Sequence, residues 1–579
     1  MQHPRLTLLA IVSFYAERVV SASCKASTIR KALPDLLGVE IKDVKAEEVL
    51  QWNEYATSAP TVPFLPVQPK PIDFCDVTVT YGHNGHGDEI NVKVWLPLKD
   101  EDWNGRFLGQ GGLGWAAGNV GALAGGVGMG YATADSDTGH TYNGHPADVA
   151  LSSTSWAFTG KGNVNLHALQ NFGYRALEEL TLLAKSVTET YYAKDIAYSY
   201  WQGCSTGGRQ GLTMAQRFPT LYNGILAAAP AINWVTFLIT EYYAHVRMSS
   251  LSYHPPACEL LAIRDFAITA CDDLDGVRDG IIAAPGDCTF SPFSVIGEPY
   301  TCDGEDRKIT PQAAEIAAVV WSGPNNTDGN PIWYGLSPDS LLPGADPLYK
   351  GLARTTCSPS STDASDCKSD PFPISADWIR NWILRDPSYD LSTIDTDSKF
   401  LDILKISQDE YHSLMDSAIP DLRTFKNSGG KILTWHGLAD QLIPPNGTID
   451  YHERVAAAST SSSSSSSGGG GIKDFMRHFE VPGLAHCFGG PGPFPLTAFN
   501  SLVEWVEKGV APEKLGTVQL PGMDGSPPEV VRGRVVCAWP RVGVWDGVGD
   551  VNEEGSWRCE EGFPGGLVGG EGGGGHDEL

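Results

Sequence analysis

The sequence predicts an α/β protein with a largely parallel sheet. Two apolar runs of strand length, residues 196–201 and 224–229, enclose a helical stretch over 209–218. The alternation resumes later in the chain, with strands expected at 431–435 and 475–481. Strands separated by helices form crossover units, and the strands of such units pair in parallel.

The remaining elements are expected from the same periodicities. Residues 77–81 and 90–96 alternate apolar and polar side chains, as half-buried strands do. Leucines recur at helical spacing over 165–183, and 497–508 has the pattern of a closing amphipathic helix. Residues 60–71 are a proline-rich connector.

A large insertion divides the α/β domain. Residues 231–421 carry several cysteines and many Pro/Ser/Asp turns, with only scattered helices expected, so we predict an inserted lid domain. The α/β domain then comprises residues 24–230 and 422–559. Within the second part, residues 459–471 are a Ser/Gly-rich stretch, which predicts a mobile surface loop.

Charge and cysteine content narrow the class of protein. The 579 residues carry a formal net charge of −28 at pH 7, which argues against nucleic acid and an anionic membrane surface as partners. The chain has 12 cysteines, an even number that favours disulfides in an exported protein. Neither a C-x-x-C pair nor a Cys/His cluster with zinc spacing occurs. The oligomeric state is not determined by the sequence.

Both ends of the chain carry targeting signals. Residues 1–23 combine a positive start, a short apolar run and small residues, which predicts a signal peptide. Asn325 and Asn446 begin N-x-T glycosylation motifs. The glycine-rich tail 560–579 ends in the four residues HDEL, an address for retrieval to the endoplasmic reticulum. We expect secretion, with residence in the lumen of the endoplasmic reticulum as the alternative.

The sequence Gly-Cys-Ser-Thr-Gly at 203–207 lies between a predicted strand and a predicted helix. This is the context of a nucleophile elbow, in which a serine stands on a sharp strand-to-helix turn. Ser205 is therefore the candidate nucleophile, and the fold class becomes an α/β-hydrolase fold with a large lid. The N–H groups of Thr206, Gly112 and Leu113 are the candidate donors to an oxyanion.

An acid and a base follow Ser205 in the order that this fold uses. Asp440 stands in the loop after one predicted strand, and His486 follows the next. His436, His140 and His452 are rival bases. His486 is favoured because Cys204 precedes the serine and Cys487 follows the histidine. A disulfide between these cysteines would hold the two side chains together.

The lid region contains an acidic turn at residues 271–282. Asp272, Asp275 and Asp279 supply closely spaced carboxylates, which suit calcium. The alternative is an acidic surface turn without a metal.

These motifs together resemble the tannase and feruloyl esterase family. The resemblance rests on 203–209 (Gly-Cys-Ser-Thr-Gly-Gly-Arg), 435–440 (Trp-His-Gly-Leu-Ala-Asp) and 482–487 (Pro-Gly-Leu-Ala-His-Cys). It also covers residues 103–107, 137–140 and the 272–282 turn, and it extends over nearly the whole chain. The Ser/Gly-rich stretch and the glycine-rich tail depart from the family pattern.

The resemblance implies further bridges and a ligand set. It implies the Cys204–Cys487 bridge and a structural calcium ion in the lid, held also by backbone oxygens of Val277 and Ile281, without an organic cofactor. The bridges Cys271–Cys288 and Cys537–Cys559 resemble family bridges, with Cys24–Cys75 as a third. The pairing of the other four cysteines stays open, and Cys357–Cys367 with Cys258–Cys302 is one arrangement.

The implied activity is hydrolysis of phenolic acid esters through an acyl-enzyme. Feruloyl esterase acting on plant cell-wall esters is the first expectation, and tannase acting on gallate esters is the second. The expected partner is a small phenolic ester, free or carried on a polysaccharide. A catalytically inactive protein of the same fold, used for binding, is the alternative of another class.

Overall fold

The computed structural model describes residues 24–53, 71–118, 120–140, 150–344, 350–358, 366–460, 471–520 and 533–562. The predicted signal peptide, nearly all of the Ser/Gly-rich stretch and the tail with its HDEL ending lie outside these residues.

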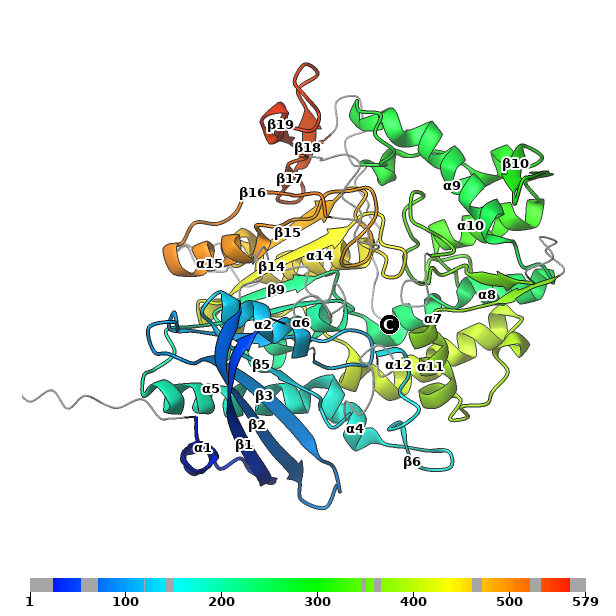
Figure 1. Cartoon of the computed structure of the whole chain (residues 1–579). Helices are drawn as coiled ribbons and strands as arrows, with labels where there is room; N and C mark the ends of the chain where they lie inside the picture. The colour runs from blue at the N-terminus through cyan, green and yellow to red at the C-terminus, as the bar shows by residue number, and fades with distance from the viewer. Residues whose placement is uncertain are drawn as a thin grey trace, which may run out of the picture.

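A nine-stranded mixed sheet forms the centre of the molecule, with strand order β1-β2-β3-β5-β4-β8-β9-β14-β15 (Figure 1). Its strands from β4 and β5 to β15 run parallel, whereas β1, β2 and β3 are antiparallel, as is the β3–β5 pair. The strands are β1 (Val39–Trp52), β2 (Ile72–His83), β3 (Ile90–Pro97), β4 (Arg106–Gln110), β5 (Ala132–Ser136), β8 (Tyr198–Cys204), β9 (Gly224–Ala228), β14 (Lys431–Gly437) and β15 (Met476–Val481). The α/β-hydrolase fold is confirmed.

Helices cover both faces of the sheet. Apolar residues of α5, α6 and α14 pack on one face, and those of α15 pack on the other. The helices of this domain are α1 (Ala26–Ala32), α2 (Val120–Gly128), α4 (Leu166–Gln170), α5 (Ala176–Tyr192), α6 (Thr206–Arg217), α13 (Arg423–Asn427), α14 (Asn446–Thr460) and α15 (Ala498–Lys508). A π-helical turn, Asn171–Arg175, joins α4 to α5.

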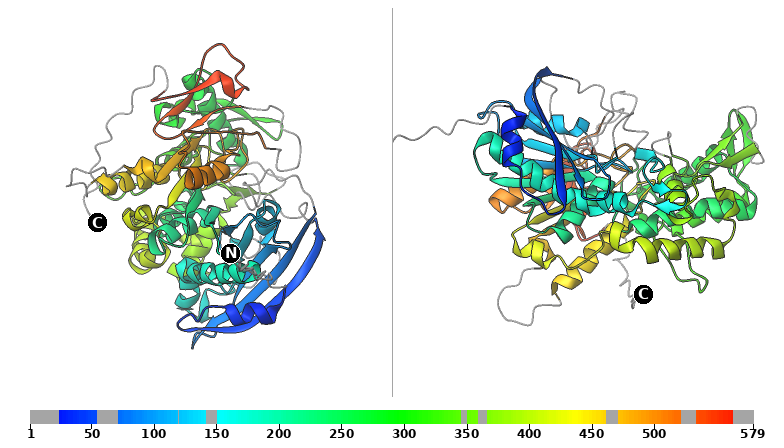
Figure 2. Two further views of the ribbon diagram at one scale, coloured as in Figure 1. Left: turned by 90° about the vertical axis from the view of Figure 1, so that its left-hand side faces the viewer. Right: turned by 90° about the horizontal axis from the view of Figure 1, so that it is seen from below.

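The inserted region is more helical than expected from the sequence. Its helices are α7 (Trp234–Thr240), α8 (Tyr243–Leu251), α9 (Ala257–Cys271), α10 (Pro311–Ser322), α11 (Pro373–Asp377) and α12 (Asp397–Met415). Many of their apolar side chains are buried in one core, which also contains Trp115, Leu169 and Phe172 from outside the insertion. The helix α7 is buried at every position, which hides its helical periodicity, whereas α12 buries a single face. The insertion and the β1–β3 strands lie on opposite sides of the molecule (Figures 1 and 2).

Short strand pairs complete the structure. They are β6 (Phe158–Gly160) with β7 (Asn163–Val164), β10 (Pro299–Cys302) with β11 (Glu305–Lys308), β12 (Thr355–Cys357) with β13 (Cys367–Ser369), β16 (Lys514–Leu515) with β17 (Val536–Cys537), and β18 (Val542–Trp545) with β19 (Trp557–Glu560). In the described residues, no helix is both long enough and apolar enough to cross a bilayer.

The strand β1 was not expected from the sequence. It lies at the edge of the sheet, pairs with β2 alone, and carries charged side chains at Lys42, Asp43, Lys45 and Glu47. Charged residues on an edge strand discourage pairing with other chains, and they also remove the alternation by which a strand is recognised.

All 12 cysteines form disulfides. The pairs are Cys24–Cys75, Cys204–Cys487, Cys258–Cys302, Cys271–Cys288, Cys357–Cys367 and Cys537–Cys559. Every pairing expected from the family resemblance is confirmed, and the arrangement of the four open cysteines is now determined.

Candidate functional site

Ser205 occupies a sharp turn between β8 and α6. Its backbone has φ 60° and ψ −121°, a conformation that non-glycine residues adopt at a cost and that is concentrated at functional sites. A Cβ at Gly203 would lie 2.6 Å from the backbone of Gly207. The strand and the helix can therefore approach closely only with glycine here, and the turn leaves the serine at the end of the strand.

The N-terminus of α6 provides a free backbone donor. In the described part of the chain, the Thr206 N–H donates no hydrogen bond. The Thr206 hydroxyl donates to the carbonyl of Gly114 at 2.7 Å, which ties the helix to the glycine-rich loop after β4. An unused N–H at a helix N-terminus beside Ser205 is suited to hold an oxyanion.

The other two predicted oxyanion donors are already engaged. The Gly112 N–H donates to Gln210 Oε1 at 3.0 Å, and the Leu113 N–H donates to the Ala116 carbonyl at 2.9 Å. Both N–H groups would have to leave these acceptors to bind an oxyanion. In this structure they instead shape the loop.

Asp440 and His486 come together at the ends of β14 and β15. His486 Nδ1 lies 2.7 Å from Asp440 Oδ2, and both side chains are buried. The other carboxylate oxygen accepts the N–H groups of Leu442 and Ile443 at 2.8 and 2.9 Å. Burial by itself would raise the pKa of Asp440, but the two neighbouring histidines, His486 and His436, outweigh burial and hold that pKa well below its usual value.

His436 is the second of these histidines and supports the same carboxylate. Its Nε2 donates to Asp440 Oδ2 at 3.0 Å and to the Ile443 carbonyl at 3.1 Å, and its Nδ1 accepts from the Thr448 hydroxyl at 2.8 Å. With both nitrogens engaged, it holds Asp440 in position and is not available as the base. Sequence reasoning had this residue only as a rival to His486.

The other rival histidines are placed elsewhere. His140 stacks on Trp156 with ring centroids 3.7 Å apart, and burial lowers its pKa to about 3. His452 on α14 packs beside Trp539, and burial lowers its pKa to about 4.

The Cys204–Cys487 disulfide covalently links the residues next to Ser205 and His486. It joins the residue before the serine to the residue after the histidine, with Cα atoms 5.9 Å apart. Cys487 has φ 63°, and the His486 N–H donates to Gln441 Oε1 at 3.1 Å. A covalent link beside each of these two residues limits how far they can separate.

Aromatic side chains of the insertion close over the glycine-rich loop. Trp115 is fully buried and follows Gly114 directly. Its ring lies 5.1 to 6.2 Å from five other aromatic rings, which belong to Trp156, Phe172, Trp234, Trp378 and Trp382. Three of these tryptophans, at 234, 378 and 382, come from the insertion, so the insertion and the loop beside Ser205 share one core.

The acidic turn has a basic partner that sequence reasoning missed. Asp275 and Asp279 each lie 2.8 Å from the guanidinium of Arg534, which comes from the segment before β17. Asp272 Oδ1 accepts the N–H groups of Asp279, Gly280 and Ile281. The oxygen donors of this turn, including the carbonyl-bearing Val277 and Ile281, suit calcium chemically, although in this structure the carboxylates bind Arg534 and backbone N–H groups.

Both glycosylation motifs reach the surface at their asparagines. Asn325 is exposed beside a turn, and Asn446 is exposed at the start of α14. Thr448 of the second motif is buried, and its hydroxyl binds His436.

Glu241 is a further buried carboxyl group near the site. It follows α7 and is 3% exposed, and within the described residues neither of its oxygens has a hydrogen-bond partner. Burial first, and then the negative charge of Asp440, raise the pKa of Glu241 well above its usual value. Both effects favour the neutral, protonated form of Glu241.

The disulfide can be tested with a matched pair of variants. Replacing Cys204 and Cys487 together by serine should lower kcat for ester hydrolysis by roughly 10- to 100-fold per folded molecule, because the covalent link that limits the separation of Ser205 and His486 is lost. Replacing Cys357 and Cys367, a bridge within the lid, should leave kcat unchanged. Full turnover in the folded C204S/C487S protein would refute this role.

Glu241→Gln should keep kcat/KM within about twofold of the wild type at neutral pH, because a neutral amide mimics a protonated carboxyl group. Glu241→Ala, which removes the side chain from a buried position, should lower the melting temperature more than the glutamine variant does. A large loss of kcat/KM in the folded glutamine variant would show that the ionised carboxylate of Glu241 is needed, against this expectation.

Comparison with known proteins identifies the family of this chain. The family model "Tannase and feruloyl esterase" matches residues 75–560. The chain is 37% identical over 96% of its length to a protein of Arthroderma benhamiae named "Probable feruloyl esterase", covering 99% of that protein. It is 26% identical over 97% of its length to the tannase of Aspergillus oryzae, covering 98% of it. The solved structure of a tannin acyl hydrolase from Aspergillus niger superposes with a TM-score of 0.79 at 28% identity, covering 93% of this chain and 96% of that one. The chain thus belongs to the tannase and feruloyl esterase family of carboxylic ester hydrolases.

Proposed function

We propose that this protein hydrolyses esters of ferulate-type phenolic acids through an acyl-enzyme formed on Ser205. The observation that carries the proposal is the joining of the Ser205 turn to the Asp440–His486 pair by the Cys204–Cys487 disulfide. Acyl transfer by a serine requires a nucleophile, a base that takes its proton and an acid that orients the base.

Each residue has a defined part in the reaction. His486 Nδ1–H donates to Asp440, which leaves Nε2 to take the proton from the Ser205 hydroxyl as it attacks the ester carbonyl. The Thr206 N–H stabilises the negative charge that develops on the carbonyl oxygen. His486 then gives its proton to the leaving alcohol. In the second half, His486 takes a proton from a water molecule as the water attacks the acyl carbonyl. It then gives that proton to Ser205 Oγ as the bond between the acyl group and Ser205 breaks, which releases the acid.

Asp440 acts as a positioning residue in this scheme. It fixes the tautomer of His486 and stabilises the imidazolium, and its low pKa keeps it ionised throughout. His436 and two backbone N–H groups hold the carboxylate in place.

We propose ferulate esters as the first candidate substrate and gallate esters as the second, according to how similar the named relatives are to this chain. The protein from Arthroderma benhamiae, whose name says feruloyl esterase, is 37% identical, whereas the tannase from Aspergillus oryzae is 26% identical. Tannase activity remains the second candidate, and esters carried on plant cell-wall polysaccharide are the proposed natural substrates. An inactive binding protein is disfavoured, because such proteins usually lack the nucleophile or the histidine.

Ser205→Ala should reduce kcat by roughly 10⁴-fold or more while the fold is retained. The measurement is kcat/KM on methyl ferulate and methyl gallate side by side, with the alanine variant as the blank. Preference for ferulate supports the proposal, and preference for gallate makes the enzyme a tannase. Turnover of neither ester by a wild-type protein whose Ser205 reacts with a fluorophosphonate would overturn the substrate class and leave the nucleophile standing.

The second part of the proposal is a structural calcium ion in the lid. Its ligands would be carboxylates of Asp272, Asp275 and Asp279 with backbone oxygens of Val277 and Ile281. The excess of carboxylates over Arg278 and Arg534 in this turn supports it, because unneutralised carboxylates at close spacing repel one another.

Removal of Ca²⁺ with a chelator should lower the melting temperature by several degrees, and addition of Ca²⁺ should restore it. The reason is that a ligand that binds only the folded state stabilises that state. Turnover per folded molecule should change little. Asp272→Asn should abolish the calcium-dependent shift. An equal melting temperature with and without chelator would contradict the calcium site.

The last part of the proposal is secretion. Six disulfides and two exposed N-x-T asparagines suit an oxidising, glycosylating route. Residence in the lumen of the endoplasmic reticulum through the HDEL ending is the alternative, and it shares these features.

A further inference from the structure

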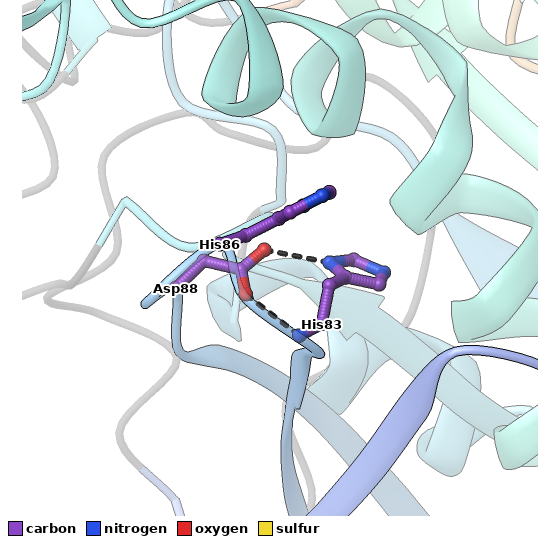
Figure 3. A group of neighbouring side chains, drawn as sticks. All are labelled: His83, His86 and Asp88. Carbon is purple, nitrogen blue, oxygen red and sulfur yellow. Dashed lines mark hydrogen bonds and ion pairs between the residues drawn. The ribbon is translucent and has the colours of Figure 1, made fainter.

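The turn between β2 and β3 gathers three metal-binding side chains far along the chain from the catalytic residues. His83 ends β2, and His86 and Asp88 follow within the turn. One ligand atom of each lies within 4.8 Å of the other two (Figure 3). Gly85 and Gly87, with φ of 83° and 68°, allow the chain to fold back so sharply.

The contacts of His83 require a proton or a metal cation between its ring and Asp88. Its Nε2 lies 2.8 Å from Glu179 Oε1, and because a carboxylate only accepts, Nε2 carries the ring proton. The Nδ1 of a neutral ring is then a lone pair, yet it faces Asp88 Oδ2 at 2.6 Å. Two lone pairs so close repel each other unless a proton or a metal cation lies between them.

The surrounding groups hold the ligands as the second layer of a metal site does. A histidine ligand commonly donates its other ring N–H to a carboxylate, as His83 does to Glu179. Asp88 accepts the His83 N–H at 2.7 Å and the Asn171 amide at 2.9 Å. Tyr81 in turn donates to Glu179 at 2.8 Å.

The third side chain is oriented but lacks a partner. His86 stacks on His167 with ring centroids 3.7 Å apart. Its Nδ1 is buried and, among the described residues, has no hydrogen-bond partner. His86 and Asp88 are only partly buried as whole residues, which leaves a path for an ion from solvent.

We propose that His83, His86 and Asp88 form a binding site for a divalent transition-metal ion, with Zn²⁺ as the occupant. Two imidazoles and one carboxylate are ligands of Zn²⁺, whereas Ca²⁺ takes oxygen ligands. Three protein ligands and one water complete a tetrahedron whose corners are about 3.3 Å apart at Zn–ligand distances of about 2.0 Å. To reach this tetrahedral arrangement, the ligand atoms of His83 and Asp88 need to move slightly apart, and His86 needs to move closer to them.

Such an ion would tie the antiparallel strands to the helix that packs on them. The turn reaches α5 through Glu179 and the π-helical turn through Asn171. The site is independent of the proposed catalytic chemistry, and its expected effect is on stability.

The test uses the untagged full-length protein, stripped with a chelator and then supplied with excess Ca²⁺. Isothermal titration calorimetry with Zn²⁺ should show one binding site per chain. The melting temperature of the Zn²⁺-bound protein should be higher than that of the stripped protein. Co²⁺ should give the visible absorption of a tetrahedral complex. His86→Gln and Asp88→Asn should each weaken Zn²⁺ binding by at least about tenfold.

The matched control is His412→Gln. His412 Nδ1 lies 2.8 Å from Asp416 Oδ2, and no third ligand completes a group there in the part of the chain that the structure describes. This variant should bind Zn²⁺ as the wild type does. Asp88→Asn keeps the acceptor for the His83 N–H, so circular dichroism should show a native fold. If wild type and folded variants bind Zn²⁺ equally, or none binds it, a proton occupies the space between His83 and Asp88 and the proposal is wrong.

Discussion

The site depends first on the Cys204–Cys487 disulfide. Its cysteines are 283 residues apart, and the whole insertion lies between them. The sheet brings β8, β9, β14 and β15 side by side, but strand pairing alone leaves the loops at the strand ends free to move. The bridge removes this freedom at the two loops where Ser205 and His486 stand. A serine held by a strained turn and a histidine held by a bonded neighbour need little reorganisation before they react.

The insertion is joined to the reacting loop by aromatic packing. Trp115 follows the glycine-rich loop and lies among tryptophans of the insertion, while Thr206 binds the carbonyl of the preceding Gly114. Arg209 on α6 is fully buried, donates to the carbonyls of Phe172, Gly173 and Met415, and thereby connects the nucleophile helix to the same region. A change in the insertion should therefore be transmitted to the loop beside Ser205, because closely packed interiors transmit strain.

Two buried carboxyl groups near the site, Asp440 and Glu241, have very different electrostatic surroundings. The carboxylate of Asp440 is stabilised by two histidines and two backbone N–H groups. Burial and the negative charge of Asp440 raise the pKa of Glu241 nearby, because a second buried charge of the same sign is costly. His436 stabilises Asp440 without being able to act as a base, since both of its nitrogens are engaged. Two neighbouring buried carboxyl groups thus have pKa values shifted in opposite directions.

The sequence by itself determined the α/β alternation, the turn at Ser205, the order Ser205, Asp440 and His486, and the bridge beside them. These are local patterns, because glycines at a turn, apolar periodicity and cysteines next to functional residues are visible in short stretches. Tertiary structure decided what depends on distant partners. Strand β1 is defined by β2, the N–H groups of Gly112 and Leu113 are taken by Gln210 and Ala116, and Arg534 comes from far along the chain to meet Asp275 and Asp279. The role of His436 as a support for Asp440 became visible only once β14 and β15 placed both histidine rings around that carboxylate, because hydrogen-bond partners are set by the fold rather than by spacing.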